Sequence, residues 1–227
     1  MLGLADAEVI SGSWLQWVHL DGADEPSWET GCARWHWMVE PEVRRGILVF
    51  DLPASRQPSS WAMIRHKETY AQPAILLRGE RGRARDLSGC HELSHILIAL
   101  LGLKIEGNEE AWCNRFAVAT LAPAHVVRRA WAREGANLGR IQRHMPRLFA
   151  TAATLRLGEL DLTPVAVFER GVIRYAAGGE LPAKESRRLA KCALRAPDGR
   201  ASGDGMRAYR LPDGLDRVGV LRSTETA

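Results

Sequence analysis

The five residues HELSH at positions 91–95 constrain this chain more than any other stretch of it. Residues four apart lie on one face of a helix, one turn apart, so His91 and His95 can hold one ion together. Glu92 projects about 100° further round the helix, where it reaches a water on that ion more readily than the ion itself. Because neutral imidazoles suit zinc, the pattern predicts a zinc site with Glu92 as general base.

The apolar run that follows the motif, residues 96–101, indicates that this helix continues into the core and ends at Gly102. Two imidazoles and a carboxylate at the start of a buried helix need partners, and a metal ion supplies them. The alternative is a chance match, which we put at roughly one in a hundred sequences of this composition. The metal site is the stronger interpretation.

The composition is that of an ordinary globular protein, with 46% apolar and 26% charged residues among 227. Four scattered cysteines without a CxxC pair favour a reducing cytoplasm. No segment is long and apolar enough to cross a bilayer, and the N-terminus does not resemble a secretion signal, so we expect no membrane contact. The net charge of +4 permits contact with nucleic acid without demanding it.

The order of the expected elements indicates the α+β class. Strand patterns come before the motif helix and further helices come after it. The expected strands cover 46–51, 61–65 and 74–77, and the next helices cover 109–121 and 124–134. The N-terminal part, residues 1–45, contains five tryptophans, which favours a core or interface role. We expect a small mixed or antiparallel sheet beside a helical core.

The sequence predicts a domain boundary after residue 160. Residues 1–160 are expected to carry the site, and residues 161–227 to form a small α+β region. That region should contain strands at 165–168, 172–175, 206–211 and 217–221, a helix at 183–195 and a loop at 197–205. Residues 137–158 have the length of a helix-turn-helix, and two packing helices are the simpler alternative. The arginine-rich stretch 78–86 is expected to be a loop, with Asp86 or Ser88 capping the motif helix.

The expected helix 109–121 has small residues and a polar end on one face. Glu110, Cys113, Asn114 and Ala117 share that face. The motif helix has a similarly small residue, Ser94, between its histidines. Because small residues let two helices approach closely, we expect a site between these helices.

HELSH and the segment EAWCNRFAVATLAP at 110–123 together resemble the ImmA/IrrE family of metallo-endopeptidases. The family pairs HExxH with a downstream Glu-x-x-Ala-Asn-x-Phe-Ala segment, and Cys113 stands in the alanine place here. The resemblance covers about residues 76–160. It implies a zincin-like fold, zinc held by His91, His95 and Glu110, and Glu92 as general base. It also implies that the substrate is a repressor-type transcription factor encoded nearby.

Glu110 is expected to be the third ligand in preference to three rivals. Only Glu110 shares the face of small residues, whereas Glu109 points about 100° away and Glu106 lies in a loop. His125 lies at the far end of the second helix, about 20 Å from its start. Asn114, one turn beyond Glu110, is expected to hydrogen-bond a ligand or a nearby backbone group.

Two other functions compete with proteolysis. The chain could be a catalytically silent zinc protein that binds a transcriptional regulator, with His125 or Cys113 closing the metal site. It could also be a DNA-binding regulator that uses residues 137–158 and holds zinc only for structure. The presence of Glu92 favours catalysis, because a purely structural site does not need a general base.

Overall fold

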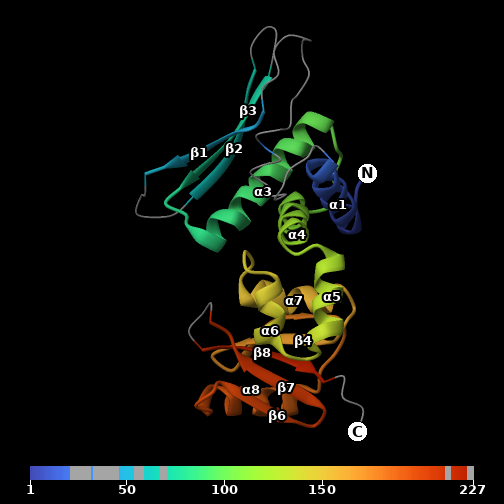
Figure 1. The fold of residues 1–227 in the computed structure, drawn as a ribbon, viewed down its shortest axis with the longest axis vertical. Coiled ribbons are helices and arrows are strands. Elements are labelled where there is room, and N and C mark those ends of the chain that lie inside the picture. The colour runs from blue at the N-terminus through green and yellow to red at the C-terminus, as the bar shows by residue number, and fades with distance from the viewer. Residues whose placement is uncertain (21–31, 33–45, 54–58, 67–70, 213–215, 224–227) are drawn as a thin grey trace. The chain divides into compact units, whose positions relative to one another are not determined.

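The computed structural model describes most of the chain and shows a mixed α+β protein (Figure 1). The residues that it does not describe are 21–31, 33–45, 54–58, 67–70, 213–215 and 224–227. The predicted α+β class is confirmed. Of the five tryptophans at 1–45, Trp14 is buried, as expected of a core residue. The side chains of the other four lie outside the described residues.

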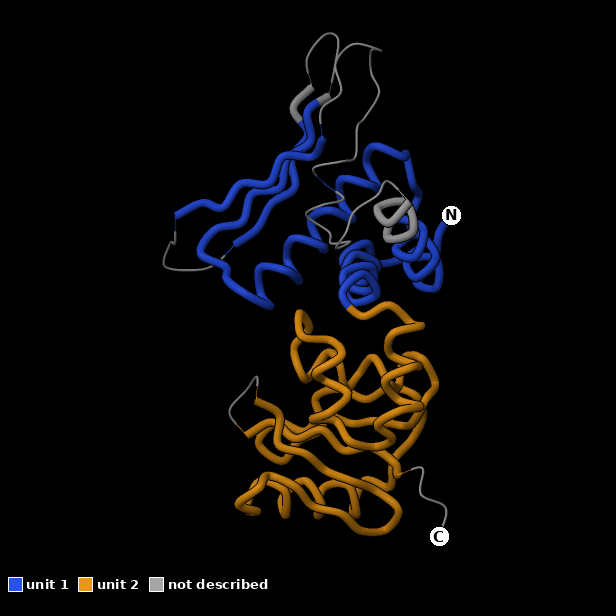
Figure 2. Tube along the Cα trace, viewed as in Figure 1, with its two compact units in different colours: residues 1–121 blue, residues 122–227 orange. Residues whose placement is uncertain are grey.

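Two compact units divide the chain, residues 1–121 and residues 122–227 (Figure 2). The division lies earlier than the predicted boundary after residue 160, because the helices that follow residue 121 pack on the C-terminal sheet. A methyl group added to Gly219 of that sheet would meet side-chain atoms of Leu138 and Thr154 at 3.2 Å. The helical segments at 137–158 therefore share a core with the C-terminal strands.

The first unit joins a three-stranded sheet to helices. Its helices are α1 (Leu4–Leu20), α3 (Gly82–Leu101) and α4 (Glu109–Leu121), and its strands are β1 (Leu48–Leu52), β2 (Ser59–His66) and β3 (Ala71–Arg78). The central strand β3 runs parallel to β1 and antiparallel to β2. The predicted small sheet is therefore mixed, and β2 is one of its edge strands.

One face of this sheet packs against α3 (Figure 1). Side chains alternate across a strand, so Ile75 and Leu77 of β3 point the same way, and both are buried in one core with Leu93 of α3. The helix α4 packs on α1 and α3. Its Trp112 and Phe116 rings stack with centroids 5.9 Å apart, and both side chains are fully buried. These contacts hold the start of α4 beside α3.

The helix α3 begins earlier than the sequence predicts. Residues 78–86 are not all loop, because the helix starts at Gly82. Asp86 and Ser88, the predicted capping residues, therefore lie inside the helix. The arginines and the alanine in this stretch are good helix formers, and the prediction gave their charge too much weight.

A tertiary contact holds the additional turn of α3. Arg85 donates two hydrogen bonds to the carboxylate of Asp51 in β1, at 2.8 and 3.0 Å. The pair joins the first turn of the helix to the neighbouring sheet. The other end of α3 is as predicted, since Gly102 adopts a left-handed conformation with φ of 61° and closes the helix.

The second unit contains a five-stranded antiparallel sheet with helices on both faces. Its elements are α5 (Ala124–Glu134), α6 (Leu138–Ile141), a 3-10 turn (Gln142–His144), α7 (Ala150–Glu159), β4 (Val165–Glu169), β5 (Val172–Ala177), α8 (Ala183–Arg195), β6 (Arg200–Gly203), β7 (Met206–Arg210) and β8 (Arg217–Arg222). The strand order is β5-β4-β8-β7-β6. Gly219 faces α6 and α7, whereas its neighbours Val218 and Val220 pack in the core that contains Leu189 of α8. The sheet therefore separates two helical layers.

The loop expected at 197–205 contains the strand β6, which pairs with β7 through a turn at Asp204 and Gly205. Asp-Gly is a hairpin signal, but the strand before it lacks the apolar alternation that identifies most strands. The segments at 137–158 are packing helices, since Arg156 is fully buried and donates to the carbonyl of Ala122.

Among the described residues, no helix is both long and apolar enough to cross a membrane.

Candidate metal centre

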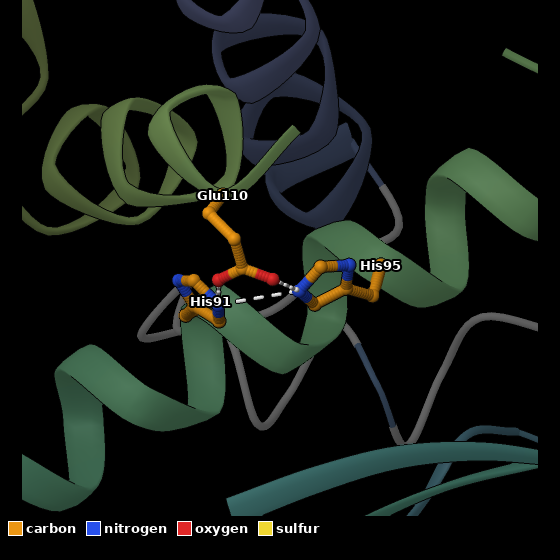
Figure 3. A group of neighbouring side chains, drawn as sticks. All are labelled: His91, His95 and Glu110. Atoms are coloured by element: carbon orange, nitrogen blue, oxygen red, sulfur yellow. Dashed lines mark hydrogen bonds and ion pairs between the residues drawn. The ribbon is translucent and has the colours of Figure 1, made fainter. Parts of the chain in front are cut away.

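The residues of the candidate site come from α3 and α4. His91 and His95 lie one turn apart on α3, with ring centroids 5.0 Å apart, and Glu110 reaches them from the first turn of α4 (Figure 3). The loop after Gly102 brings the start of α4 back along α3, as the short separation in sequence requires. These three residues form a group that could hold a metal ion.

The donor atoms of this group converge. The Nε2 atoms of His91 and His95 lie 3.2 Å apart. Glu110 places Oε2 at 3.1 Å from Nε2 of His91 and Oε1 at 3.5 Å from Nε2 of His95. Ligand atoms at 2.0–2.1 Å from a tetrahedral zinc ion lie about 3.3–3.4 Å from one another. The spacing of the two Nε2 atoms therefore suits ligation of one small metal ion, and the Glu110 carboxylate lies within reach of the same ion.

The outer nitrogens of both imidazoles also have partners. Nδ1 of His91 lies 3.1 Å from Oδ1 of Asn114, and Nδ1 of His95 lies 2.9 Å from Oε1 of Glu109. An oxygen acceptor at Nδ1 favours the tautomer that carries its proton there, and this turns the Nε2 lone pair toward the centre. Two such lone pairs and a carboxylate then face one another. This arrangement is electrostatically unfavourable unless a metal ion or a proton lies between them.

Asn114 lies where the sequence predicts it, one turn beyond Glu110 and against a histidine. Glu109 has a role that the sequence did not reveal. An acidic residue in the first turn of a helix is favoured by the helix dipole alone, so its presence was no signal of a contact. The contact arises because consecutive residues of α4 point about 100° apart, which lets Glu110 reach Nε2 of the histidine pair while Glu109 reaches Nδ1 of His95.

Cys113 is the third residue of a second group, with His95 and Glu109. Its sulfur lies 3.6 Å from Nδ1 of His95, and its side chain is fully buried. Burial raises the pKa of the Cys113 thiol to about 12, despite an opposing hydrogen bond from Ser94. Glu109 and Cys113 therefore both lie against Nδ1 of His95, on the side of the ring away from Glu110, where they orient the imidazole.

Glu92 is buried on the side of α3 that faces the sheet. Its side chain is 7% exposed, and its Oε1 accepts a hydrogen bond of 2.8 Å from the hydroxyl of Ser60 in β2. A buried carboxylate needs such a donor. Ser60 is a second residue that sequence reasoning missed, because it lies 32 positions before Glu92 in a strand without a distinctive motif.

The site opens to solvent. The side chain of Glu110 is 67% exposed, while His91 and His95 are about one-fifth exposed. Of the rival ligands, Glu106 is exposed and belongs to neither group of potential ligands, and His125 lies in α5 of the second unit. A metal ion held by three side chains at the surface would keep a position free for another molecule.

The candidate centre rests on this geometry and on the sequence motif. No protein-family model matches the chain, and no curated protein matches it.

Proposed function

We propose that this chain is a zinc-dependent endopeptidase. The observation that carries the proposal is the convergence of His91, His95 and Glu110, with Glu92 directly after His91 on the same helix. Three protein ligands with an exposed fourth position are typical of catalytic zinc sites, whereas structural sites are closed by four. Bound zinc supplies a Lewis acid that polarises a carbonyl and lowers the pKa of a water.

Glu92 is the general base of the proposed reaction. It follows His91 directly on α3, so it lies beside the metal ligands without joining them. Its hydrogen bond from Ser60 uses one carboxylate oxygen and fixes the side chain. The other oxygen takes a proton from water and passes it to the leaving amine.

The proposed substrate is a protein. We propose that an extended segment of this protein pairs with β2. β2 is an edge strand of the described sheet and carries Ser60, the partner of Glu92. An edge strand offers unpaired backbone groups to a peptide in the extended conformation. A segment paired with β2 would lie beside the proposed base.

The proposed target is a repressor-type transcription factor encoded near this gene. This part of the proposal rests on the resemblance to the ImmA/IrrE family at residues 91–95 and 110–123, and it is an analogy. Cleavage of such a repressor would relieve repression.

The test is to incubate the zinc-loaded chain with the neighbouring repressor and to look for defined fragments. Glu92→Gln should keep its zinc but stop cleavage, because an amide cannot accept the proton. Glu106→Gln is the matched control, since it makes the same change at an exposed residue outside the site, and it should cleave as the parent does. If Glu92→Gln cuts as well as the parent, the mechanism is wrong. Stable binding of the repressor without cleavage by the parent would instead identify a silent zinc protein.

A further inference from the structure

We propose that the exposed face of α8 binds the phosphate backbone of duplex DNA. This face consists of Lys184, Arg187, Arg188, Lys191 and Arg195, and we call it the α8 basic face. All five side chains are exposed. The proposal does not depend on the metal centre, so either can fail without the other.

The charge of the chain is unevenly distributed. Residues 122–227 contain nineteen Lys and Arg against eleven Asp and Glu, whereas residues 1–121 contain twelve against sixteen. The modest net charge of the whole chain therefore conceals a strongly basic second unit. A basic domain attracts polyanions and accelerates their association.

The α8 basic face is a continuous stripe. At 100° per residue, its five cations fall within an arc of about 100° on the helix. The buried residues Ser186, Leu189, Ala190 and Ala193 lie on the opposite side, against the sheet. Among the described residues, only Arg188 of the five forms an ion pair, with Asp204. Four cations of one stripe therefore remain available to an external anion.

The dimensions of this stripe suit duplex DNA. From Lys184 to Arg195 the helix advances about 16 Å. One strand of B-DNA carries about five phosphates over that length. Three of the five cations are arginines, whose planar guanidinium groups bind phosphate in a bidentate manner.

Other polyanions fit this face less well. The sequence of α8 contains no aromatic residue, whereas proteins that bind single strands stack bases on aromatic rings. A lipid-binding helix inserts apolar residues, and the apolar residues of α8 are buried in the core of the unit. The arginines of α5, namely Arg128, Arg129 and Arg133, spread over a wider arc of about 140° and are fewer.

The proposal is tested with the full-length chain and a fluorescent 20-base-pair duplex, by anisotropy at several salt concentrations. Arg187→Gln, Lys191→Gln and Arg195→Gln combined should weaken binding and make the logarithmic salt slope smaller by about three. The matched control combines Arg128→Gln, Arg129→Gln and Arg133→Gln, which changes the net charge equally in the same unit. It should retain most of the binding and of the slope. Equal losses in the two triple variants would mean that net charge, and not the α8 basic face, attracts the DNA.

Cys192 provides a second measurement that needs no variant. It borders the α8 basic face and is exposed, whereas the other three cysteines are buried. Saturating duplex should slow the reaction of Cys192 with a maleimide several-fold. An unchanged rate under saturation would overturn the proposal. Stronger binding of single-stranded DNA, duplex RNA or anionic vesicles than of duplex DNA would also overturn it and assign the face to that polyanion.

Discussion

Glu109 and His95 are joined by a contact of 2.9 Å between a carboxylate oxygen and Nδ1, on the side of the imidazole that faces away from Glu110. One turn of α4 thus supplies both a potential metal ligand and the group that orients another ligand. Outer partners of this kind set the tautomer of a histidine and increase its basicity toward a metal. The pairing makes the two adjacent glutamates chemically distinct.

We expect both glutamates to matter for zinc binding, in a defined order. Glu110→Ala removes a ligand and should weaken zinc binding most. Glu109→Ala removes the partner of His95 and should weaken it about 10-fold or more, since such outer partners contribute 10–100-fold. Glu109→Gln keeps an oxygen acceptor and should restore part of the affinity. The sequence by itself predicts only that Glu110, and not Glu109, is the third ligand.

Competition with a chromophoric zinc chelator measures these affinities. Glu106→Ala is the control, because it removes an exposed carboxylate from the loop before α4. An affinity for Glu109→Ala equal to that of the parent would show that the contact with His95 does not support the metal.

Ser60→Ala should slow proteolysis without loss of zinc. The hydroxyl of Ser60 donates to Glu92, and a hydrogen bond to a charged group contributes about 1.5–3 kcal/mol. Without it the carboxylate of Glu92 is less well positioned, so we expect cleavage to be at least about tenfold slower. Ser60→Thr retains the hydroxyl and should restore most of the rate. Zinc analysis of both variants distinguishes the effect from loss of metal, and full activity in Ser60→Ala would exclude a positioning role.

Gly158→Ala should destabilise the second unit although alanine favours helices. A methyl group at Gly158 in α7 would lie 2.6 Å from backbone atoms of Ala177 in β5, so the helix must move away from the sheet. Such overpacking costs about 1–3 kcal/mol, which exceeds the gain in helix propensity of about 1 kcal/mol. Gly139→Ala is the matched control, because its nearest neighbour would lie at 3.7 Å. Urea denaturation should find Gly158→Ala less stable and Gly139→Ala unchanged or slightly more stable.

The Asp51–Arg85 pair should give a small pH-dependent stabilisation. The hydrogen bond from Arg85 lowers the pKa of Asp51 below its ordinary value of 3.8. A carboxyl with a lowered folded-state pKa stabilises the fold above pH 3.8, and this contribution disappears as the pH falls through the folded-state value.

Asp51→Asn should therefore be slightly less stable than the parent at pH 7. Asp51 is largely exposed, so we expect a difference below about 1 kcal/mol. Urea midpoints of both proteins between pH 7 and pH 3 provide the measurement. The difference should shrink at the acidic end, and a difference that grew there would reverse the sign of the argument.

Local periodicity was enough to place the histidine pair and several helices. His91 and His95 share a face because any helix repeats every 3.6 residues. The bounds of α4 follow from Asn108, whose side chain accepts a hydrogen bond from the backbone of Ala111, and from Pro123, which stops the helix. The amphipathic pattern of α8 likewise predicts its limits, 183–195, and they agree with the structure.

Tertiary packing decided the features that local patterns do not encode. Ser60 meets Glu92 only because β2 lies beside α3, and nothing near Ser60 in the sequence marks that contact. Gly158 lies against Ala177, which assigns α7 to the second unit rather than to the predicted domain 1–160. Glu109 and Glu110 are equivalent as first-turn acids, and the direction from which α4 approaches α3 alone decides which nitrogen each one meets. Side-chain type and spacing are properties of one helix, whereas the partner of each side chain depends on where a second element lies.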